Sequence, residues 1–192
     1  TRRNAYHLKS VNRLAFRLNK TAVRWADAVV ANSNLAAEQC AQLEGVSRGR
    51  IHRIDNGVDC SRFGGFSSEA AKERLGFTGI KPLVGIVANL RPIKGLMTFL
   101  DAAKILRQDF PSAHFVIVGK GPQEVELEMR ANALGLSSCA HFMGTNDAIA
   151  SVMASFDVAV QCSLSESFSN VLIEYMASAK PIVATRVGDA HR

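Results

Sequence analysis

From Leu83 to Ala184 the chain alternates short apolar runs with longer runs of helical spacing, and this alternation constrains the fold more than any other feature. Five apolar runs predict strands, at residues 83–88, 114–118, 140–143, 156–160 and 182–184. The runs with helical spacing lie between them, at residues 96–106, 124–134, 149–154 and 171–177. Strands that alternate with helices are typical of a parallel sheet covered on both faces. We therefore expect an α/β, Rossmann-like domain with right-handed crossovers.

Polar segments, most of them containing glycine, follow four of the predicted strands. They are residues 89–95, 119–122, 144–145 and 166–174. The carboxyl ends of parallel strands lie at one edge of a sheet, and ligands bind at that edge. We therefore expect these segments to converge on a single binding site.

The last of these segments holds two glutamates, Glu166 and Glu174, on either side of a polar turn and a predicted helix start. We expect Ser169 or Asn170 to be the N-cap of that helix. The first turn of a helix binds anions, because its amides lack internal partners and the helix dipole is positive there. Carboxylates beside such a site suggest a phosphate flanked by hydroxyls, as in a nucleotide sugar. A capped helix with two solvated glutamates is the alternative, and the spacing alone does not decide between them.

Five short motifs occur in a fixed order along the chain. They are Asn56-Gly57-Val58-Asp59, Lys94-Gly95, Gly119-Lys120-Gly121-Pro122, Glu166 to Asn170 with Glu174, and Lys180 to Thr185. In this order they resemble the motifs of retaining glycosyltransferases of the GT-B fold, in family four (glycosyl transferases group 1). The resemblance implies a transferase that takes a sugar from a nucleotide-diphosphate sugar with retention of configuration. A UDP-sugar is favoured as the donor, with GDP-mannose as the alternative.

The resemblance also implies roles for the residues of the fourth motif, which contains the two glutamates. Glu174 would hold the ribose hydroxyls, and Glu166 would contact the transferred sugar as a catalytic residue. The backbone amides of Phe168, Ser169 and Asn170 would hold sugar and phosphate oxygens. Ser169 stands where the family usually has glycine. No general base for the acceptor is visible in the sequence.

Two cations, Lys94 and Arg91, are the other catalytic residues that we predict. Without a metal, the charge on the departing phosphate is neutralised by cations and backbone dipoles. Many family members place the arginine five positions before the lysine, where this chain has Asn89. Either Arg91 reaches the phosphates from a shifted position, or Asn89 takes over part of the role. The remaining predicted donor-binding residues are Gly95, Gly119 and Gly121, which give the backbone room near the ligand, and Gly144 and Thr145, whose backbone would border the base as the resemblance implies.

Composition excludes several other classes of protein. The chain has 192 residues, of which 47% are hydrophobic and 21% charged, as in ordinary globular domains. No apolar run approaches the length of a membrane span, and no secretory signal is visible. The four cysteines and five histidines lack metal-ligand or redox spacing, so we expect no metal and no cofactor. We expect a cytoplasmic protein, with the inner face of the membrane as the alternative location.

The net charge of +6 is placed unevenly, because residues 1–24 hold seven basic side chains and no acid. Residues 4–24 also have the spacing of an amphipathic helix. We favour packing of this helix on a neighbouring domain, with peripheral contact to an anionic membrane as the alternative. Nucleic acid is not an expected partner, because no nucleic-acid-binding module is visible.

The resemblance divides the chain into parts of two domains. We assign residues 1–63 to the tail of an acceptor-binding domain, 64–81 to a linker, and 82–192 to an incomplete nucleotide-sugar-binding domain. The first part is predicted to hold strands within residues 25–33 and at 51–54, with a helix at 34–43, and a further helix is predicted at 69–75. The chain thus looks like an internal fragment that binds nucleotide weakly and transfers nothing by itself. The sequence does not decide whether the acceptor is a glycan, a lipid carrier or a small molecule.

The sequence leaves two other functions open. A sugar-nucleotide epimerase shares the two-domain architecture but would need further acid and base residues. A non-catalytic nucleotide-binding module would share the fold without the transferase activity. A dinucleotide-binding oxidoreductase is disfavoured, because Asn89-Leu90-Arg91-Pro92 follows the first predicted strand of the sheet in place of Gly-x-Gly-x-x-Gly.

Overall fold

The structure, a computed structural model, describes residues 21–23 and 25–190 and separates into two compact units. The first unit contains the chain up to Gly57, the stretch Ser165–Ser169 and the stretch from Arg186 onward. The second unit contains Val58–Leu164 and Asn170–Thr185. The helix predicted over residues 4–24 lies almost entirely outside the described residues.

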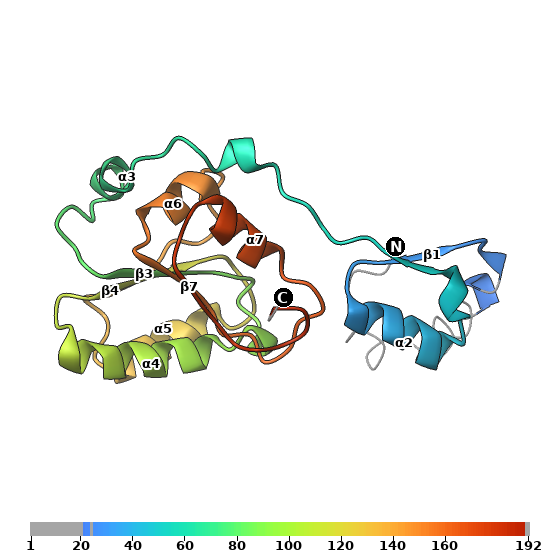
Figure 1. The fold of residues 1–192 in the computed structure, drawn as a ribbon. Coiled ribbons are helices and arrows are strands. Elements are labelled where there is room, and N and C mark those ends of the chain that lie inside the picture. Colours follow the sequence, from blue (N-terminus) through green and yellow to red (C-terminus); the bar gives the residue numbers. More distant parts are fainter. Residues whose placement is uncertain (1–20, 24, 191–192) are drawn as a thin grey trace. The chain divides into compact units, whose positions relative to one another are not determined.

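The first unit is a small βαβ arrangement. Strands β1 (Val29–Ala31) and β2 (Ile51–Arg53) pair in parallel, and helix α2 (Asn34–Glu44) connects them (Figure 1). The side chain of Ser33 caps α2, because its Oγ accepts the amide of Ala36 at 3.0 Å. The predicted helix at residues 34–43 is therefore confirmed, and Ser33 is its cap. The first strand is shorter than the run we predicted from residue 25, since Trp25 is still helical and is 86% exposed.

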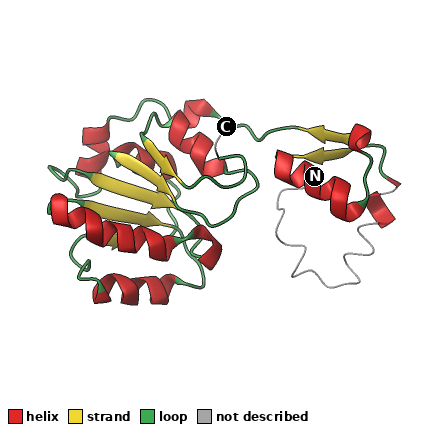
Figure 2. Cartoon of the chain, turned by 60° about the horizontal axis from the view of Figure 1, so that its bottom comes forward, coloured by secondary structure: helices red, strands yellow, loops and turns green. Residues whose placement is uncertain are grey.

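The second unit is built on a five-stranded parallel sheet in the order β5-β4-β3-β6-β7 (Figures 1 and 2). Its strands are β3 (Leu83–Val87), β4 (His114–Val118), β5 (Ala140–Phe142), β6 (Val158–Gln161) and β7 (Ile182–Ala184). The central strand β3 pairs with β4 on one side and β6 on the other, so Gly85 is opposite both Val116 and Ala159. The order reverses beside β3, as in doubly wound folds.

Helices cover both faces of this sheet (Figure 1). Helices α4 (Leu96–Asp109) and α5 (Glu124–Ala133) lie on one face. Helices α6 (Ile149–Ser155) and α7 (Asn170–Ala177) lie on the other, with α3 (Ser68–Arg74) beside α6. The α/β, Rossmann-like fold predicted from the alternation is confirmed. Among residues 21–23 and 25–190, no helix is both long enough and apolar enough to cross a bilayer.

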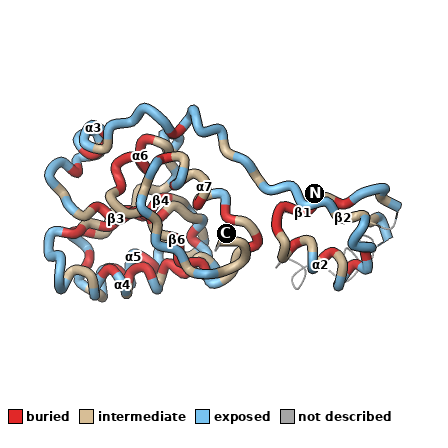
Figure 3. Tube along the Cα trace, in the orientation of Figure 1, coloured by how far each residue is buried: buried red, intermediate tan, exposed pale blue. Residues whose placement is uncertain are grey.

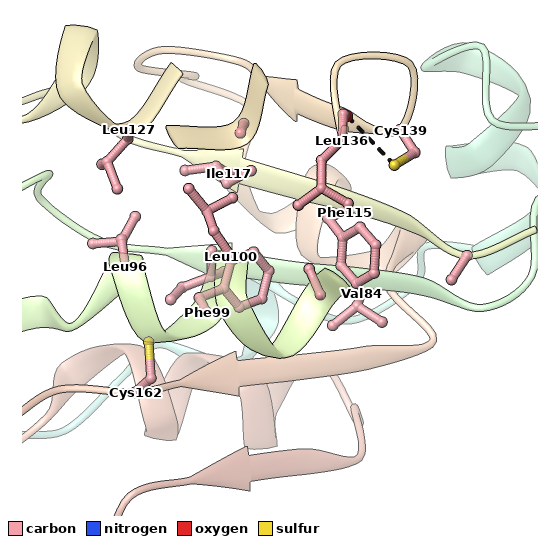
Figure 4. Packing of buried hydrophobic residues seen from close by; sticks show 14 of the residues in the cluster. Val84, Leu96, Phe99, Leu100, Phe115, Ile117, Leu127, Leu136, Cys139 and Cys162 are labelled. Atoms are coloured by element: carbon pink, nitrogen blue, oxygen red, sulfur yellow. Dashed lines mark hydrogen bonds between the residues drawn. The ribbon is translucent and has the colours of Figure 1, made fainter. Parts of the chain in front are cut away.

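The main core lies between the sheet and the helices α4 and α5. The rings of Phe99 and Phe115 meet edge to face with centroids 6.1 Å apart, and Leu100, Ile117 and Leu127 pack around them (Figure 4). The trace in Figure 3 shows the same pattern, since the central strands β3 and β4 are mostly buried while much of the flanking helices is exposed. This periodic burial explains why the sequence pattern predicted the elements.

On the opposite face of the sheet, one predicted strand boundary is wrong. We predicted a strand from residue 156, but Phe156 ends α6, where its amide donates to the carbonyl of Met153, and β6 begins at Val158. The Phe156 ring fills the space over β3 where a methyl group on Gly85 would lie. Phe156 is therefore an apolar core residue that precedes its strand, and hydrophobicity alone did not separate the two roles.

Residues 64–81, our predicted linker, carry α3 and pack within the second unit. The ammonium of Lys72 in α3 contacts both carboxylate oxygens of Asp157 at 2.7 and 2.8 Å, and it also donates to the carbonyl of Ile80. Asp157 in turn accepts the amide of Leu83 at 2.7 Å. This ion pair attaches α3 to the start of β3, and the position of the domain boundary stays a prediction.

Candidate functional site

The loop after β4 is bonded to the loops on both sides of it at the carboxyl edge of the sheet. The amide of Gly119 donates to the carbonyl of Gly144, in the loop after β5, at 2.7 Å. The amide of Leu90, in the loop after β3, donates to the carbonyl of Lys120 at 3.0 Å. The segments after β3, β4 and β5 therefore meet, as the topology predicted.

Glycine allows these loops to approach each other. A methyl group on Gly119 would collide with the carbonyl oxygen of Ala88, and one on Gly121 would collide with that of Leu90. Gly119 also has a φ of +135°, which side-chain-bearing residues rarely adopt. We predicted that both glycines leave room for a ligand; the structure adds that they leave room for the loop after β3.

The loop after β6 contacts the same region. The amide of Leu164 donates to the carbonyl of Ile93 at 2.8 Å, and the Cys162 thiol donates to the carbonyl of Gly95 at 3.1 Å. Burial raises the pKa of Cys162 to about 11, so the thiol keeps its proton and can donate. A methyl group on Gly95, whose φ is +68°, would collide with the carbonyl oxygen of Cys162.

The predicted cations lie in a tight turn that directly follows β3. The amide of Arg91 donates to the carbonyl of Asn89, and the amide of Lys94 donates to the carbonyl of Arg91. The side chains of Asn89 and Arg91 are exposed, while Lys94 is half-buried at the end of the 3₁₀ turn η4 (Pro92–Lys94).

Helix α4 begins at Leu96, immediately after this turn, and has no side-chain cap. The first turn of an α-helix presents amide groups and the positive end of the dipole, which favour an anion. Lys94 adds a full positive charge two residues before the helix starts. The turn and the helix start together make an anion-binding arrangement at the carboxyl edge of the sheet.

The second predicted glutamate, Glu174, lies on α7 in the same unit. Glu174 is half-buried, and burial raises the pKa of its carboxyl, while the positive charge of Arg62 partly lowers it. Arg62 closes the short 3₁₀ turn η3 (Cys60–Arg62). Sequence reasoning missed Arg62, because nothing in its spacing from Glu174 signals that the two charges interact.

The predicted residues before α7 group with the first unit. There a methyl group on Gly188 would collide with the carbonyl oxygen of Glu166, and the amide of Asp189 donates to the carbonyl of Ser167 at 3.3 Å. The Asp189 carboxylate accepts the amide of Asn34, at the start of α2, at 3.0 Å. This stretch is therefore fixed by backbone contacts within the first unit.

The side chains of this stretch differ in burial. Glu166 and Phe168 are half-buried and Ser169 is buried. Asn170 is exposed and is the first residue of α7, so Ser169 immediately precedes that helix. The last predicted residue, Thr145, is exposed beside Gly144, where the Lys120 side chain lies 3.2 Å from the position of an added methyl group. Within the described part of the chain, no group of three or more His, Cys, Asp or Glu side chains is arranged to hold a metal ion.

Comparison with known sequences gives consistent matches along the chain. Residues 81–192 match the family described as "Glycosyl transferases group 1", and residues 1–62 match "Glycosyltransferase Family 4". The chain is 31% identical over 179 residues to D-inositol 3-phosphate glycosyltransferase of Nocardia farcinica, covering 88% of this chain and 40% of that protein. The enzyme of the same name from Mycolicibacterium smegmatis is 30% identical over 171 residues, covering 85% and 38%. The chain thus spans about two fifths of the length of these relatives.

Solved structures share the fold. Anabaena Alr3699/HepE in complex with UDP aligns with a TM-score of 0.86 at 26% identity, covering 98% of this chain and 53% of that one. Its complex with UDP-glucose aligns with a TM-score of 0.83 at 28% identity, covering 95% and 51%. WaaG, a glycosyltransferase involved in lipopolysaccharide biosynthesis, has a TM-score of 0.77 at 19% identity, covering 84% and 45%. The likeness to WaaG is one of fold alone.

Proposed function

Because the chain belongs to the glycosyl transferases group 1 family, we propose that it is the donor-binding part of an enzyme that transfers a sugar from a nucleotide-diphosphate sugar. One observation carries the proposal: the uncapped start of α4 and the turn with Lys94 form an anion-binding arrangement at the carboxyl edge of the sheet. A diphosphate is the part of a sugar nucleotide that such an arrangement would bind.

The proposed donor is a UDP-sugar, with GDP-mannose as the alternative. The support comes from Anabaena HepE, which was solved with UDP and with UDP-glucose and is 26–28% identical to most of this chain. Retention of configuration and the choice of sugar belong to the same proposal, and both rest on the family resemblance.

In the proposed reaction the bond between the sugar and the terminal phosphate breaks, and its electron pair leaves with the nucleotide. Charge therefore builds up on that phosphate, where Lys94 and Arg91 would neutralise it. Arginine can hold two phosphate oxygens at once, whereas lysine acts as a point charge. The exposed position of Arg91 leaves its guanidinium free to turn toward the ligand.

The two glutamates would recognise hydroxyl groups. We assign the ribose hydroxyls to Glu174, since a carboxylate can accept two hydrogen bonds from a diol. Glu166 would contact the transferred sugar. The amides of Phe168, Ser169 and Asn170 would donate to sugar and phosphate oxygens, because Ser169 and Asn170 stand at the start of α7.

The domain assignment is also part of the proposal. Residues 1–63 would be the tail of the acceptor-binding domain and 82–192 most of the donor-binding domain, with 64–81 between them. The family matches support this division, since one ends at residue 62 and the next begins at residue 81. The four cysteines form no disulfide, which fits the proposed cytoplasmic location. Contact with an anionic membrane through residues 1–24 is proposed from their charge alone.

Isothermal titration of the chain with UDP tests the proposal. We expect micromolar binding, and we expect Glu174→Ala to raise the Kd at least about tenfold, because hydrogen bonds to a charged carboxylate are each worth ~1.5–3 kcal/mol. The matched control is Glu128→Ala, which removes an exposed glutamate from α5 in the same unit. This control should leave the Kd unchanged. Equal affinities for wild type and Glu174→Ala would contradict the assignment of Glu174.

A further inference from the structure

Tyr175 is fully buried next to Glu174 on α7, with a relative exposure of 0%. Its hydroxyl oxygen accepts the amide of Val87, the last residue of β3, at 2.8 Å. The same hydroxyl donates to the carbonyl of Val160 in β6 at 3.3 Å. One side chain from α7 thus bridges the backbones of two neighbouring strands.

The bridge lies where the two strands part. The pairing of β3 with β6 ends with Ile86 opposite Val160, and the next amide of β3, that of Val87, bonds the Tyr175 hydroxyl. The following amide, that of Ala88, points the other way and donates to Val118 of β4, as expected where successive amides of a strand alternate between its two neighbours. Strand β3 therefore leaves β6 at this hydroxyl. The parting is at the point where the strand order reverses, beside the loops of the candidate site.

The hydroxyl is suited to hold both bonds at once. Burial raises the pKa of Tyr175 above its usual range, so the hydroxyl keeps its proton and donates to the carbonyl of Val160 while it accepts from Val87. A phenylalanine would fill the same volume but would leave that amide and that carbonyl without this partner. Buried backbone groups without a partner are costly, so α7 would be expected to shift.

We propose that Tyr175 is a positioning residue, whose hydroxyl fixes α7 against β3 and β6 so that the Glu174 carboxylate is held toward the nucleotide. This inference rests on the proposed function of Glu174 in donor binding. Tyr175 itself is enclosed between the helix and the sheet, so it acts through its neighbour on α7 and not by touching the ligand.

A double-mutant cycle on UDP affinity tests the inference. Tyr175→Phe should raise the Kd for UDP about tenfold, and Glu174→Ala should also raise it. In the Glu174→Ala background, Tyr175→Phe should change the Kd less than about twofold, because the residue through which it acts is gone. A role limited to general stability would give the same fold-change in both backgrounds, and that result would overturn the proposal.

Ser155→Ala is the matched control. Ser155 on α6 is fully buried, and its hydroxyl donates to the carbonyl of Val152 at 2.7 Å within its own helix. Its removal deletes a buried hydroxyl from the same unit, and the hydrogen bond that is lost lies within α6. We expect a lower melting temperature with an unchanged Kd for UDP. A rise in Kd equal to that of Tyr175→Phe would show that lost stability alone explains the effect.

A second measurement separates this inference from the proposed function. NMR titration of the Glu174 carboxyl in the unliganded chain reports its surroundings directly. In Tyr175→Phe the raised pKa of Glu174 should move toward the ordinary value for glutamate, as the carboxyl becomes less enclosed. If the wild-type chain binds no UDP, the proposed function fails and this measurement alone decides on Tyr175. An unchanged Glu174 pKa in the variant would overturn the positioning role.

Discussion

Gly95 shows how one residue joins two loops of the candidate site. It ends the turn with Lys94, has a φ of +68°, and lies against the carbonyl of Cys162. The sequence motif predicted a glycine that lets a ligand approach. It could not predict that the neighbouring backbone comes from the loop after β6, because that contact joins positions far apart in the chain.

Gly95→Ala should therefore both destabilise the chain and weaken nucleotide binding. We expect a loss of roughly 2–4 kcal/mol in the free energy of unfolding, from the left-handed backbone and the collision together. Gly79→Ala is the control, since Gly79 has a φ of +75° with open space around it. It should cost only about 1–2 kcal/mol. Urea unfolding of both variants measures the difference, and equal losses would show that the contact with Cys162 is not tight.

If Glu174 binds the ribose hydroxyls as proposed, the affinity for UDP should depend on pH. The carboxylate accepts hydrogen bonds only when ionised, and burial raises its pKa. UDP affinity should therefore fall as the pH drops through this raised pKa, starting at a higher pH than for an ordinary glutamate. Titrations at several pH values measure the effect, and Glu174→Gln should flatten the profile. A wild-type affinity that is constant across this range would contradict the role.

For the stability of the unliganded chain the sign is opposite. A glutamate whose pKa is raised on folding favours the folded state when it is protonated. Its contribution is fully present below the pKa of the unfolded chain and is lost as the pH rises through the raised folded value. Binding of UDP should therefore release protons, since the ligand favours the ionised carboxylate.

At the scale of elements, the sequence predicted the sheet and its helices well and the attachments between them poorly. The strands at residues 114–118 and 182–184 were predicted with the observed bounds, because each is a short apolar run between polar turns. The docking of α3 could not be predicted, since Lys72 and Asp157 are distant in sequence. A lysine in a polar helix gives no signal that it is buried.

Asp157→Ala should destabilise the second unit strongly. The side chains of Lys72 and Asp157 are only 10% and 22% exposed, and the change also removes the acceptor of the Leu83 amide. Breaking a buried pair from one side costs about 3–5 kcal/mol, and we expect a loss near the lower value. The exposed pair of Asp101 and Arg130, 2.7 Å apart, is the control. Asp101→Ala should lower the free energy of unfolding by less than about 1 kcal/mol. Denaturant unfolding of both variants measures the difference, and equal losses would contradict the role of the buried ion pair.

At the scale of the whole molecule, the grouping of segments differs from their order in the sequence. Residues 165–169 and those from 186 onward belong to the first unit, although in the sequence both stretches directly follow segments of the second unit. The sequence motif treats Glu166 and Glu174 as one continuous feature, while the contacts place them in different units. Sequence spacing could not reveal this division, because it follows from the contacts of Gly188 and Asp189 with the stretch before α7.

We propose that a nucleotide diphosphate binds at the carboxyl edge of the parallel sheet. The most direct test of this proposal is an NMR titration of the isotope-labelled chain with UDP, following the backbone amides. The largest shifts are expected at Gly95, Gly121 and Asn170, with little change at His114, which begins β4 at the opposite edge. Shifts centred on His114, or none at saturating UDP, would contradict it.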